Sequence, residues 1–312
     1  LKALNHRTRK NEILTDFILH HHDPSPYGEK IRKLFGVKGL AWKSVQVSMV
    51  MPRPDMTALT GGYRRIPVMQ IGGDVFCDTL IIARIIDMLH PSPSVFQSGL
   101  MANLAIQQWS DMMFRPGAAL SLYENAEYLP DDVVTDRAAY FTFLDFENFA
   151  EDAPHFRSQF ITFTSQLNHQ LADGRAFMFG DNAEWGDINA YMNIWMAGGN
   201  IPSSEDFLAK FPHISGWYDR MDKFGYGERT DIASSDALEI AVKAQDNLGG
   251  FRIGAHNEDM SGCQPGDPVT IQPDDYGIVP VAGFLEMSND EEIIIRRTQI
   301  DVGEIYLHIH AK

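Results

Sequence analysis

Cysteine is scarce in this chain of 312 residues, which contains only Cys77 and Cys263. The two lie far apart and neither belongs to a CxxC pair, which argues against a disulfide scaffold and against a zinc finger. The cysteine usage therefore favours a reducing, cytoplasmic location.

Long apolar runs and positive charge are also lacking. No apolar run approaches the roughly 20 residues that a membrane helix requires, and the opening stretch LKALNHRTRK has no apolar core of a secretory signal. The net charge of −16 argues against a nucleic-acid partner, because binding to phosphate backbones depends on basic surface. We therefore expect no membrane and no nucleic acid among the partners.

What the chain does contain is the composition of a globular protein, with 44% hydrophobic and 22% charged residues. Its length is enough for two or three compact units. One segment departs from the acidic balance: residues 24–65 carry eight Lys and Arg against Glu29 and Asp55, which gives 8 − 2 = +6. This segment fits either a small-anion site or a solvated helix face.

The first part of the chain alternates strands and helices. Residues 12–22 predict a buried strand, 25–39 a helix with Pro26 at its first position, and 42–50 a second strand. After an irregular connection over 51–63, residues 65–71 and 75–79 predict two strands joined by a tight hairpin, and 79–89 predict an apolar helix. This order predicts a thioredoxin-like α/β domain over residues 11–90.

Two further parts follow. Residues 98–230 predict an all-helical domain, because apolar residues recur at helical spacing in five stretches, at 100–114, 137–150, 155–174, 187–199 and 213–225. Residues 231–312 predict a helix at 234–244 and then a small β-rich extension. Its strand candidates are 268–273, 278–287, 291–300 and 304–312.

The histidines do not predict a metal site. His20, His21 and His22 alternate between the two faces of a strand, so they cannot readily chelate one ion. His308 and His310 share a face of the last predicted strand, but no acidic or cysteine partner stands nearby at ligand-like spacing. An ordinary strand face is therefore the favoured interpretation, and we expect no metal.

The stretch Ser25-Pro26-Tyr27 lies at a strand-to-helix junction. A helix N-terminus stabilises an anion, and a hydroxyl there can donate a hydrogen bond to a thiolate and so lower the pKa of the thiol. Taken without context, the favoured explanation is that Ser25 only caps the helix.

Two more motifs suit a peptide-like ligand. Pro67 begins a predicted strand, and a cis Ile66–Pro67 bond would turn the main chain of Ile66 outward to pair with an extended peptide. Thr79 is placed to cap the next helix and would suit a carboxylate, while Asp78 could pair with an ammonium group. A plain capping pair explains Asp78 and Thr79 equally simply.

Together these motifs resemble the cytosolic glutathione transferases of the serine type. The resemblance is carried by SPY at residue 25, RRIPV at 64 and FCDTLIIARIID at 76, and by FMFGDNAEWGDINAY at 177, where Asp187 matches a buried aspartate of that family. It covers residues 11–230. One departure is Glu184, which stands where the family usually has a Ser or Thr cap, and another is the extra C-terminal domain.

The resemblance implies a role for particular residues. Ser25 matches the catalytic serine. The remaining positions imply glutathione binding, with Ile66 and Pro67 at the cysteinyl unit and Asp78 and Thr79 at the γ-glutamyl end. Arg53 is implied at the glycyl carboxylate, with Arg64 or Arg65 assisting, and Tyr27 is implied as a further glutathione-binding residue.

A glutathione-dependent enzyme is the function that the resemblance implies. The thiolate of glutathione, as co-substrate, would attack a small hydrophobic electrophile or a peroxide, which is the chemistry of detoxification by a homodimeric glutathione transferase. Two alternatives stay open: isomerase or lyase chemistry in which glutathione is returned, and a non-catalytic glutathione-binding or structural member.

Overall fold

The computed structural model describes residues 16–254 and 262–311. The expectations for residues 1–15, including the charged opening stretch and the start of the first strand, lie outside these residues. The chain forms two compact units. Of the described residues, one unit contains 16–31, 40–89, 228–254 and 262–311, and the other contains 32–39 and 90–227.

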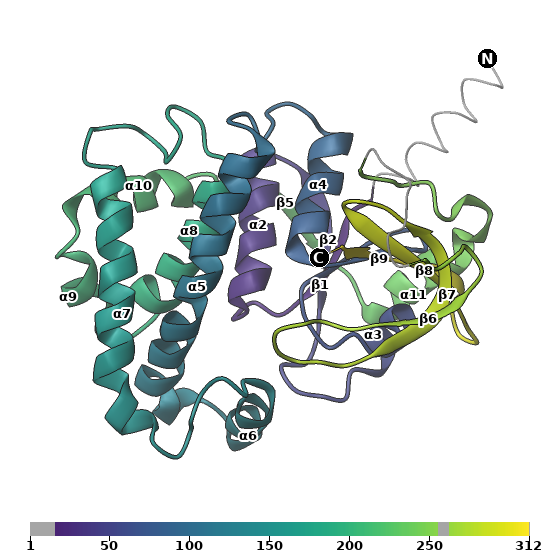
Figure 1. The fold of residues 1–312 in the computed structure, drawn as a ribbon, viewed down its shortest axis with the longest axis horizontal. Coiled ribbons are helices and arrows are strands. Elements are labelled where there is room, and N and C mark those ends of the chain that lie inside the picture. The colour runs from purple at the N-terminus through teal and green to yellow at the C-terminus, as the bar shows by residue number, and fades with distance from the viewer. Residues whose placement is uncertain (1–15, 255–261, 312) are drawn as a thin grey trace. The chain divides into compact units, whose positions relative to one another are not determined.

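The first unit is built on a single mixed sheet (Figure 1). Within the described residues, nine strands follow the order β5-β2-β1-β3-β4-β9-β8-β7-β6. The strands are β1 (Ile18–His21), β2 (Ala41–Gln46), β3 (Val68–Ile71), β4 (Asp74–Cys77), β5 (Glu228–Asp231), β6 (Pro268–Ile271), β7 (Val281–Ser288), β8 (Glu292–Gln299) and β9 (Gly303–His310). Its helical segments are α3 (Pro54–Thr60), α4 (Thr79–Leu89), α11 (Ser234–Lys243), the short η3 (Gln245–Asn247) and the first turns of α2 (Pro26–Lys38).

The thioredoxin-like half of this unit is confirmed. β1 runs parallel to β2 and antiparallel to β3. β3 and β4 form the predicted hairpin, whose turn contains Gly72 at a φ of 62°. A left-handed backbone of this kind is open to glycine at little steric expense, which explains why glycine occupies the turn.

The C-terminal extension is β-rich, as predicted, and it continues the same sheet. β9 pairs in parallel with β4, with Asp74 opposite Tyr306 and Cys77 opposite Ile309, and β5 pairs in parallel with β2 on the other side. The extension also shares a core with the thioredoxin-like half. Its buried members are Met56, Leu59, Tyr63, Val68, Val75, Cys77, Ala241, Val281, Ile295, Val302, Ile305 and Leu307. These shared contacts place the described residues of the extension in the first unit, whereas the sequence predicted a separate third part.

A buried polar cluster joins β4 to the extension. His308 on β9 is fully buried, with its Nε2 2.7 Å from Asp74 Oδ1 and its Nδ1 3.4 Å from Glu292 Oε2. The imidazole also stacks on Phe76, with ring centroids 4.4 Å apart. Although burial alone would lower it, the hydrogen bonds to the two carboxylates raise the pKa of His308.

Two local predictions differ from the structure. The connection over 51–63 contains the helix α3, which begins with Pro54 at its first turn and ends at Gly61, where φ is 69°. The predicted helix over 137–150 is instead the end of α6 (Asp131–Tyr140), a loop and the start of α7 (Phe149–Gln170). Its aromatic residues pack with one another in the loop, where Phe141 lies against Phe143 with ring centroids 5.2 Å apart.

The second unit is helical, as predicted. It contains the later turns of α2, then α5 (Leu100–Glu124), η1 (Ala126–Tyr128), α6 (Asp131–Tyr140), α7 (Phe149–Gln170), α8 (Trp185–Ile194), the π-helical η2 (Trp195–Gly199), α9 (Ser204–Leu208) and α10 (Pro212–Asp222). The long helices α5 and α7 lie side by side (Figure 1).

Asp187 organises the start of α8. Its carboxylate accepts hydrogen bonds from the main-chain N–H of Met178 at 2.8 Å, that of Glu184 at 3.1 Å and the indole of Trp217 at 2.8 Å. Glu184 itself accepts from the Ser98 hydroxyl at 2.7 Å. The unexpected Glu184 therefore ties α8 to the preceding chain through its carboxylate.

Replacement of Asp187 by alanine should lower the free energy of unfolding by about 2–4 kcal/mol, because buried donors lose their acceptor. Burial raises the pKa of Asp187 from 3.8 to about 6. The wild-type carboxyl thus favours folding most below pH 3.8 and loses that contribution as the pH rises through 6. Urea unfolding at pH 4.5 and 7.5 should therefore show a smaller difference between the two proteins at pH 7.5. The exposed Asp181→Ala is the control, and an equal effect from it would contradict the prediction.

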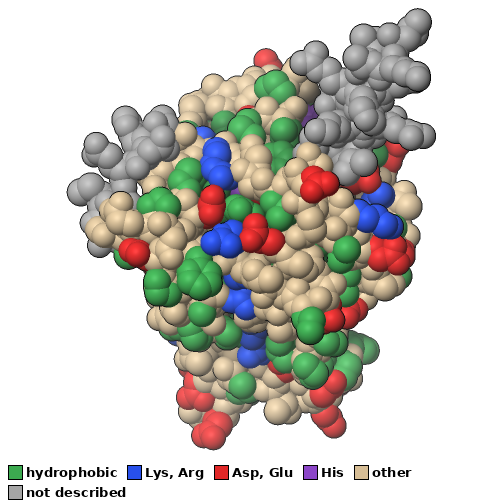
Figure 2. All heavy atoms as spheres, turned by 90° about the vertical axis from the view of Figure 1, so that its right-hand side faces the viewer, with side chains coloured by type: hydrophobic (Ala, Val, Ile, Leu, Met, Phe, Trp, Pro, Cys, Tyr) green, Lys and Arg blue, Asp and Glu red, His purple; other side chains and the backbone are tan. Residues whose placement is uncertain are grey.

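The basic segment over 24–65 does not form a basic surface. Five of its eight cationic side chains are buried: Lys30, Arg32, Lys33, Lys38 and Arg53. Lys38, for example, donates to the carbonyls of His90 and Pro93, each at 2.7 Å. On the face that Figure 2 presents, acidic, basic and apolar side chains are interspersed. The local excess of positive charge is thus largely internal.

Candidate functional site

Three sequence motifs meet at one end of the sheet. Ser25 follows the end of β1, Pro67 precedes β3, and Asp78 follows the end of β4. The register places His20 of β1 opposite Val68 of β3, and Met69 of β3 opposite Phe76 of β4. Because β3 runs opposite to both neighbours, its beginning lies beside their ends. The topology therefore brings the three motifs to a common edge.

Ser25 is the N-cap of α2 and is 5% exposed. Its Oγ accepts a hydrogen bond of 3.0 Å from the main-chain N–H of Gly28, which confirms the capping interpretation. The same geometry leaves the hydroxyl hydrogen able to donate, because Oγ acts toward Gly28 only as an acceptor. Capping and anion stabilisation are thus compatible at this residue.

The Ile66–Pro67 peptide bond is cis. This is the geometry that the peptide-binding interpretation of Ile66 specified. Pro67 is buried and Ile66 is half-buried at the start of β3.

The start of α4 combines a cap with a buried cation. Asp78, rather than Thr79, caps the helix, because its Oδ1 accepts a hydrogen bond of 2.7 Å from the N–H of Leu80. Thr79 is the first helical residue, and the ammonium of Lys30 lies 3.4 Å from its Oγ1. The fully buried Lys30 also lies 4.8 Å from the ring centroid of Tyr27. Its charge therefore links the first turn of α2 to the first turn of α4.

The sequence analysis did not predict Lys30 as a site residue, because it was only one of eight Lys and Arg residues in a basic segment. The helical spacing from Ser25 to Lys30 was visible, but nothing local indicated that its ammonium would reach Thr79, 49 residues away. This cation makes the start of α4 electropositive, which favours a carboxylate there.

Arg53 lies directly before α3, and its guanidinium contacts the chain segments on both sides of this helix. Its guanidinium donates to the carbonyls of Ser48 at 2.8 Å, Arg64 at 2.8 Å and Met49 at 3.1 Å, and the residue is 8% exposed. These contacts favour a role in shaping the loop. The assignment of Arg53 to a glycyl carboxylate stays a prediction.

Arg65 is bound by the extension. Its guanidinium donates to the carboxylate of Asp275 and to the carbonyl of Tyr276, and it lies 4.4 Å from the centroid of the Tyr276 ring. Although burial opposes it, the hydrogen bond to Asp275 raises the pKa of Arg65. The guanidinium of Arg65, which the sequence analysis assigned to glutathione binding, is thus paired with a carboxylate of the chain itself.

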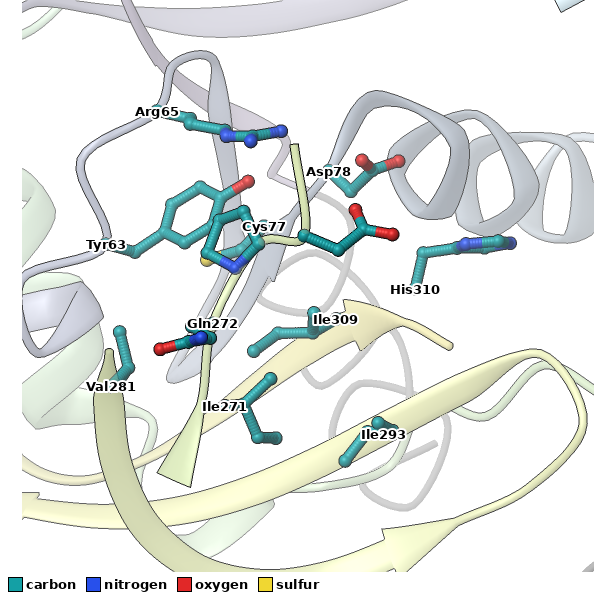
Figure 3. A pocket seen from close by; sticks show the side chains of 12 residues that line it. Tyr63, Arg65, Cys77, Asp78, Ile271, Gln272, Val281, Ile293, Ile309 and His310 are labelled. Atoms are coloured by element: carbon teal, nitrogen blue, oxygen red, sulfur yellow. The ribbon is translucent and has the colours of Figure 1, made fainter. Parts of the chain in front are cut away.

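A cavity of about 170 Å³ lies beside Arg65 and Asp78 (Figure 3). Its apolar wall includes the four branched side chains Ile271, Val281, Ile293 and Ile309, all from the extension. Tyr63, Arg65, Cys77, Asp78, Gln272, Pro273, Asp274 and His310 complete the lining. Burial raises the pKa of the Cys77 thiol, so this cysteine is present as the neutral thiol.

The histidines are used inside the protein. His20 Nε2 lies 2.9 Å from Gln70 Oε1, and His21 Nε2 lies 3.1 Å from Ser44 Oγ. His308 does have acidic partners, Asp74 and Glu292, but these come from other strands and could not be seen from spacing. Within residues 16–254 and 262–311, no group of three or more His, Cys, Asp or Glu side chains is arranged to hold a metal ion. No helix in the same ranges combines the length and apolar character needed to span a membrane.

Comparison with known protein families matches residues 19–94 to the N-terminal domain of glutathione S-transferases. Comparison with curated protein sequences gives no match. Among solved structures, a GST-like protein from Pseudomonas syringae is 31% identical and has a TM-score of 0.76. The alignment covers 94% of this chain and 96% of that protein, so it includes most of the C-terminal extension.

More distant structures share the fold. A tau class glutathione S-transferase from mango, Mangifera indica, is 19% identical with a TM-score of 0.51, over 74% of this chain and 98% of that one. A glutathione S-transferase from Methylobacterium radiotolerans, solved in complex with glutathione sulfonate, is 18% identical with a TM-score of 0.50, over 70% of this chain and 98% of that one. These likenesses concern the fold alone.

Proposed function

Because the chain belongs to the glutathione S-transferase superfamily, we propose that it binds glutathione at the Ser25, Pro67 and Asp78 edge and activates the thiol for transfer. The observation that supports this most directly is the meeting of the three motifs at one end of the sheet. Each motif alone has a plain structural explanation, but a single extended ligand accounts for all three together.

In this proposal, each end of glutathione finds complementary chemistry. The main chain of Ile66 pairs with the cysteinyl unit, and the helix start at Thr79, with Lys30 behind it, receives the γ-glutamyl α-carboxylate. Asp78 faces the α-ammonium group, with the oxygen that does not cap Leu80 still able to accept. Tyr27 borders the site next to Lys30.

The chemical step follows from the serine. The Ser25 hydroxyl and the N-terminus of α2 stabilise the glutathione thiolate, and the thiol proton passes to solvent. The sulfur then forms a bond to an electrophilic carbon of a hydrophobic substrate, and a leaving group departs with the electron pair. Serine rather than cysteine at this position favours transfer over thiol-disulfide exchange. Homodimer formation stays a prediction from the family resemblance, and a cytoplasmic location stays a prediction from the cysteine usage.

The test is to incubate the purified full chain with glutathione and a panel of an aryl halide, an α,β-unsaturated aldehyde and an organic hydroperoxide, with mass spectrometry of the products. We expect glutathione to be found attached to at least one electrophilic carbon, at a rate well above the reaction without protein. Product formed with glutathione returned unchanged would instead identify an isomerase or lyase. Binding of glutathione without turnover of any substrate would contradict the catalytic part of the proposal.

A further inference from the structure

The C-terminal extension forms one wall of the cavity next to Asp78. Residues 271–274 lie in this wall, together with side chains from β7, β8 and β9. Opposite them are Tyr63, Arg65, Cys77 and Asp78 of the thioredoxin-like half (Figure 3). All of these residues belong to the same compact unit. The cavity is therefore a joint product of two segments that are about 200 residues apart in the sequence.

The wall is fixed in place by Arg65. The guanidinium is bound by both the side chain of Asp275 and the main chain of Tyr276, and it packs on the Tyr276 ring. The contacts hold the segment directly after Asp274 against the loop before β3. Arg65 thus holds this wall of the cavity in place through Asp275 and Tyr276.

The charge around the cavity favours a cation. The carboxylates of Asp78 and Asp274 line the cavity, and the carboxylate of Asp275 accepts a hydrogen bond from Arg65, which also lines it. Three carboxylates against one guanidinium leave a balance of 1 − 3 = −2, or −1 when His310 is protonated. The balance of these groups is negative in either state of the imidazole, and the positive charge of Lys30 lies beside Thr79, so an ammonium group is favoured over a carboxylate on the Asp274 side of Asp78.

The apolar part of the lining strengthens the same preference. Ile271, Ile293 and Ile309 exclude water from one side of the cavity. A charge pair formed next to such a wall is screened less than one in open solvent. An ammonium group beside the half-buried Asp78 is therefore screened less than at an ordinary surface, whereas Asp274 approaches it from the exposed side.

We propose that Asp274 of the extension, together with Asp78, binds the α-ammonium group of the γ-glutamyl end of glutathione. The assignment rests on the proposed function and adds to it a residue from outside the thioredoxin-like half. The extension thereby determines specificity for a ligand that carries a free amino group. The α-carboxylate of the same ligand lies on the other side, toward Thr79 and Lys30, so the site matches a zwitterion.

The test compares two ligands and three proteins by calorimetry. The ligands are glutathione and its des-amino analogue, in which a glutaryl group replaces the γ-glutamyl group. For Asp274→Asn we expect about tenfold weaker binding of glutathione and unchanged binding of the analogue. Since Asp274 is exposed, the variant is expected to fold normally. Asp301→Asn, an exposed change in the turn between β8 and β9, should alter neither affinity.

The outcomes distinguish failure of the Asp274 assignment from failure of the proposed glutathione site. Equal weakening of both ligands by Asp274→Asn, or no weakening of either, would overturn the assignment of Asp274 while leaving the proposed glutathione site intact. If the wild-type chain binds neither glutathione nor the des-amino analogue, the proposed function is overturned, and the assignment of Asp274 with it.

Discussion

Replacement of Ser25 by alanine should lower the turnover of glutathione conjugation about a hundredfold, while the dissociation constant for glutathione changes by less than about threefold. The reason is that one preorganised donor to a developing or stabilised anion is typically worth a factor of that size in kcat. The ligand is held mainly elsewhere, along Pro67 and the start of α4. Steady-state kinetics and calorimetry measure the two effects separately.

The pKa of the bound thiol gives a direct reading of the same interaction. With Ser25 present, we expect the ultraviolet absorbance of the thiolate to titrate near neutral pH. In Ser25→Ala, the titration should move up toward the value of about 8.5 that a free thiol shows. Unchanged conjugation rates across the panel of electrophiles would show that Ser25 is not the activating group, and Tyr27 would then be the next candidate.

Ser25 also caps α2, so the catalytic effect must be separated from a loss of helix stability. Alanine removes the acceptor for Gly28 N–H, which costs about 1 kcal/mol at a typical N-cap. Ser25→Asp retains a capping acceptor but places a negative charge where the thiolate would lie. Ser25→Thr retains both the cap and the hydroxyl. Activity should therefore survive in Ser25→Thr and be lost in Ser25→Asp, with both variants as stable as the wild type.

Local patterns were sufficient to predict most of the thioredoxin-like half. Pro26 marked the first turn of α2, Gly72 and Gly73 marked the hairpin, and the apolar run at 79–89 marked α4. These signals act over a few residues, so they can be read without knowing the fold. The motifs at Ser25, Pro67 and Asp78 resemble those of a known family, and this resemblance predicted that all three serve one binding site.

Long-range contacts could not be predicted in this way. The extension showed strand patterns, but nothing in them indicated that β9 would pair with β4, across 234 residues from Asp74 to His308. The contact between Arg65 and Asp275 spans 210 residues and reverses the expected role of the arginine. In each case the partner depends on strand order, which a local pattern does not encode. The short helix α3 has local signals, with Pro54 in its first turn and Gly61 at its end, but its packing against α11 and β4 joins segments that are distant in the sequence.

Replacement of His308 by leucine should lower the free energy of unfolding by about 3–5 kcal/mol. The imidazole lies between Asp74 and Glu292, and all three side chains are almost completely buried. Leucine fills a similar space but leaves two carboxylates facing an apolar side chain, and an uncompensated buried charge carries a penalty of that size. Urea unfolding followed by circular dichroism measures the change.

The pH dependence tests the charge on His308. Because its pKa is raised in the folded protein, the contribution of His308 to stability is complete below its unfolded value of 6.5 and is lost as the pH rises through the folded value. The difference between wild type and His308→Leu should therefore be larger at pH 6 than at pH 9. A difference that grows with pH would show that the imidazole is buried in its neutral form.

Two further variants identify the origin of the effect. Asp74→Asn and Glu292→Gln, added to His308→Leu, remove the stranded charges and should recover at least half of the lost stability, since neutral replacement of a whole buried charge cluster is often tolerated. Lys243→Met breaks an exposed pair with Glu239 and should leave unfolding almost unchanged. Because His308 and Glu292 belong to the extension and Asp74 to the hairpin, a recovery in the triple variant would mean that charge balance holds β9 against β4. Failure to recover would mean that the hydrogen bonds which the carboxylates of Asp74 and Glu292 accept from the main-chain N–H groups of Gly249 and Ile253 are the greater part of the attachment.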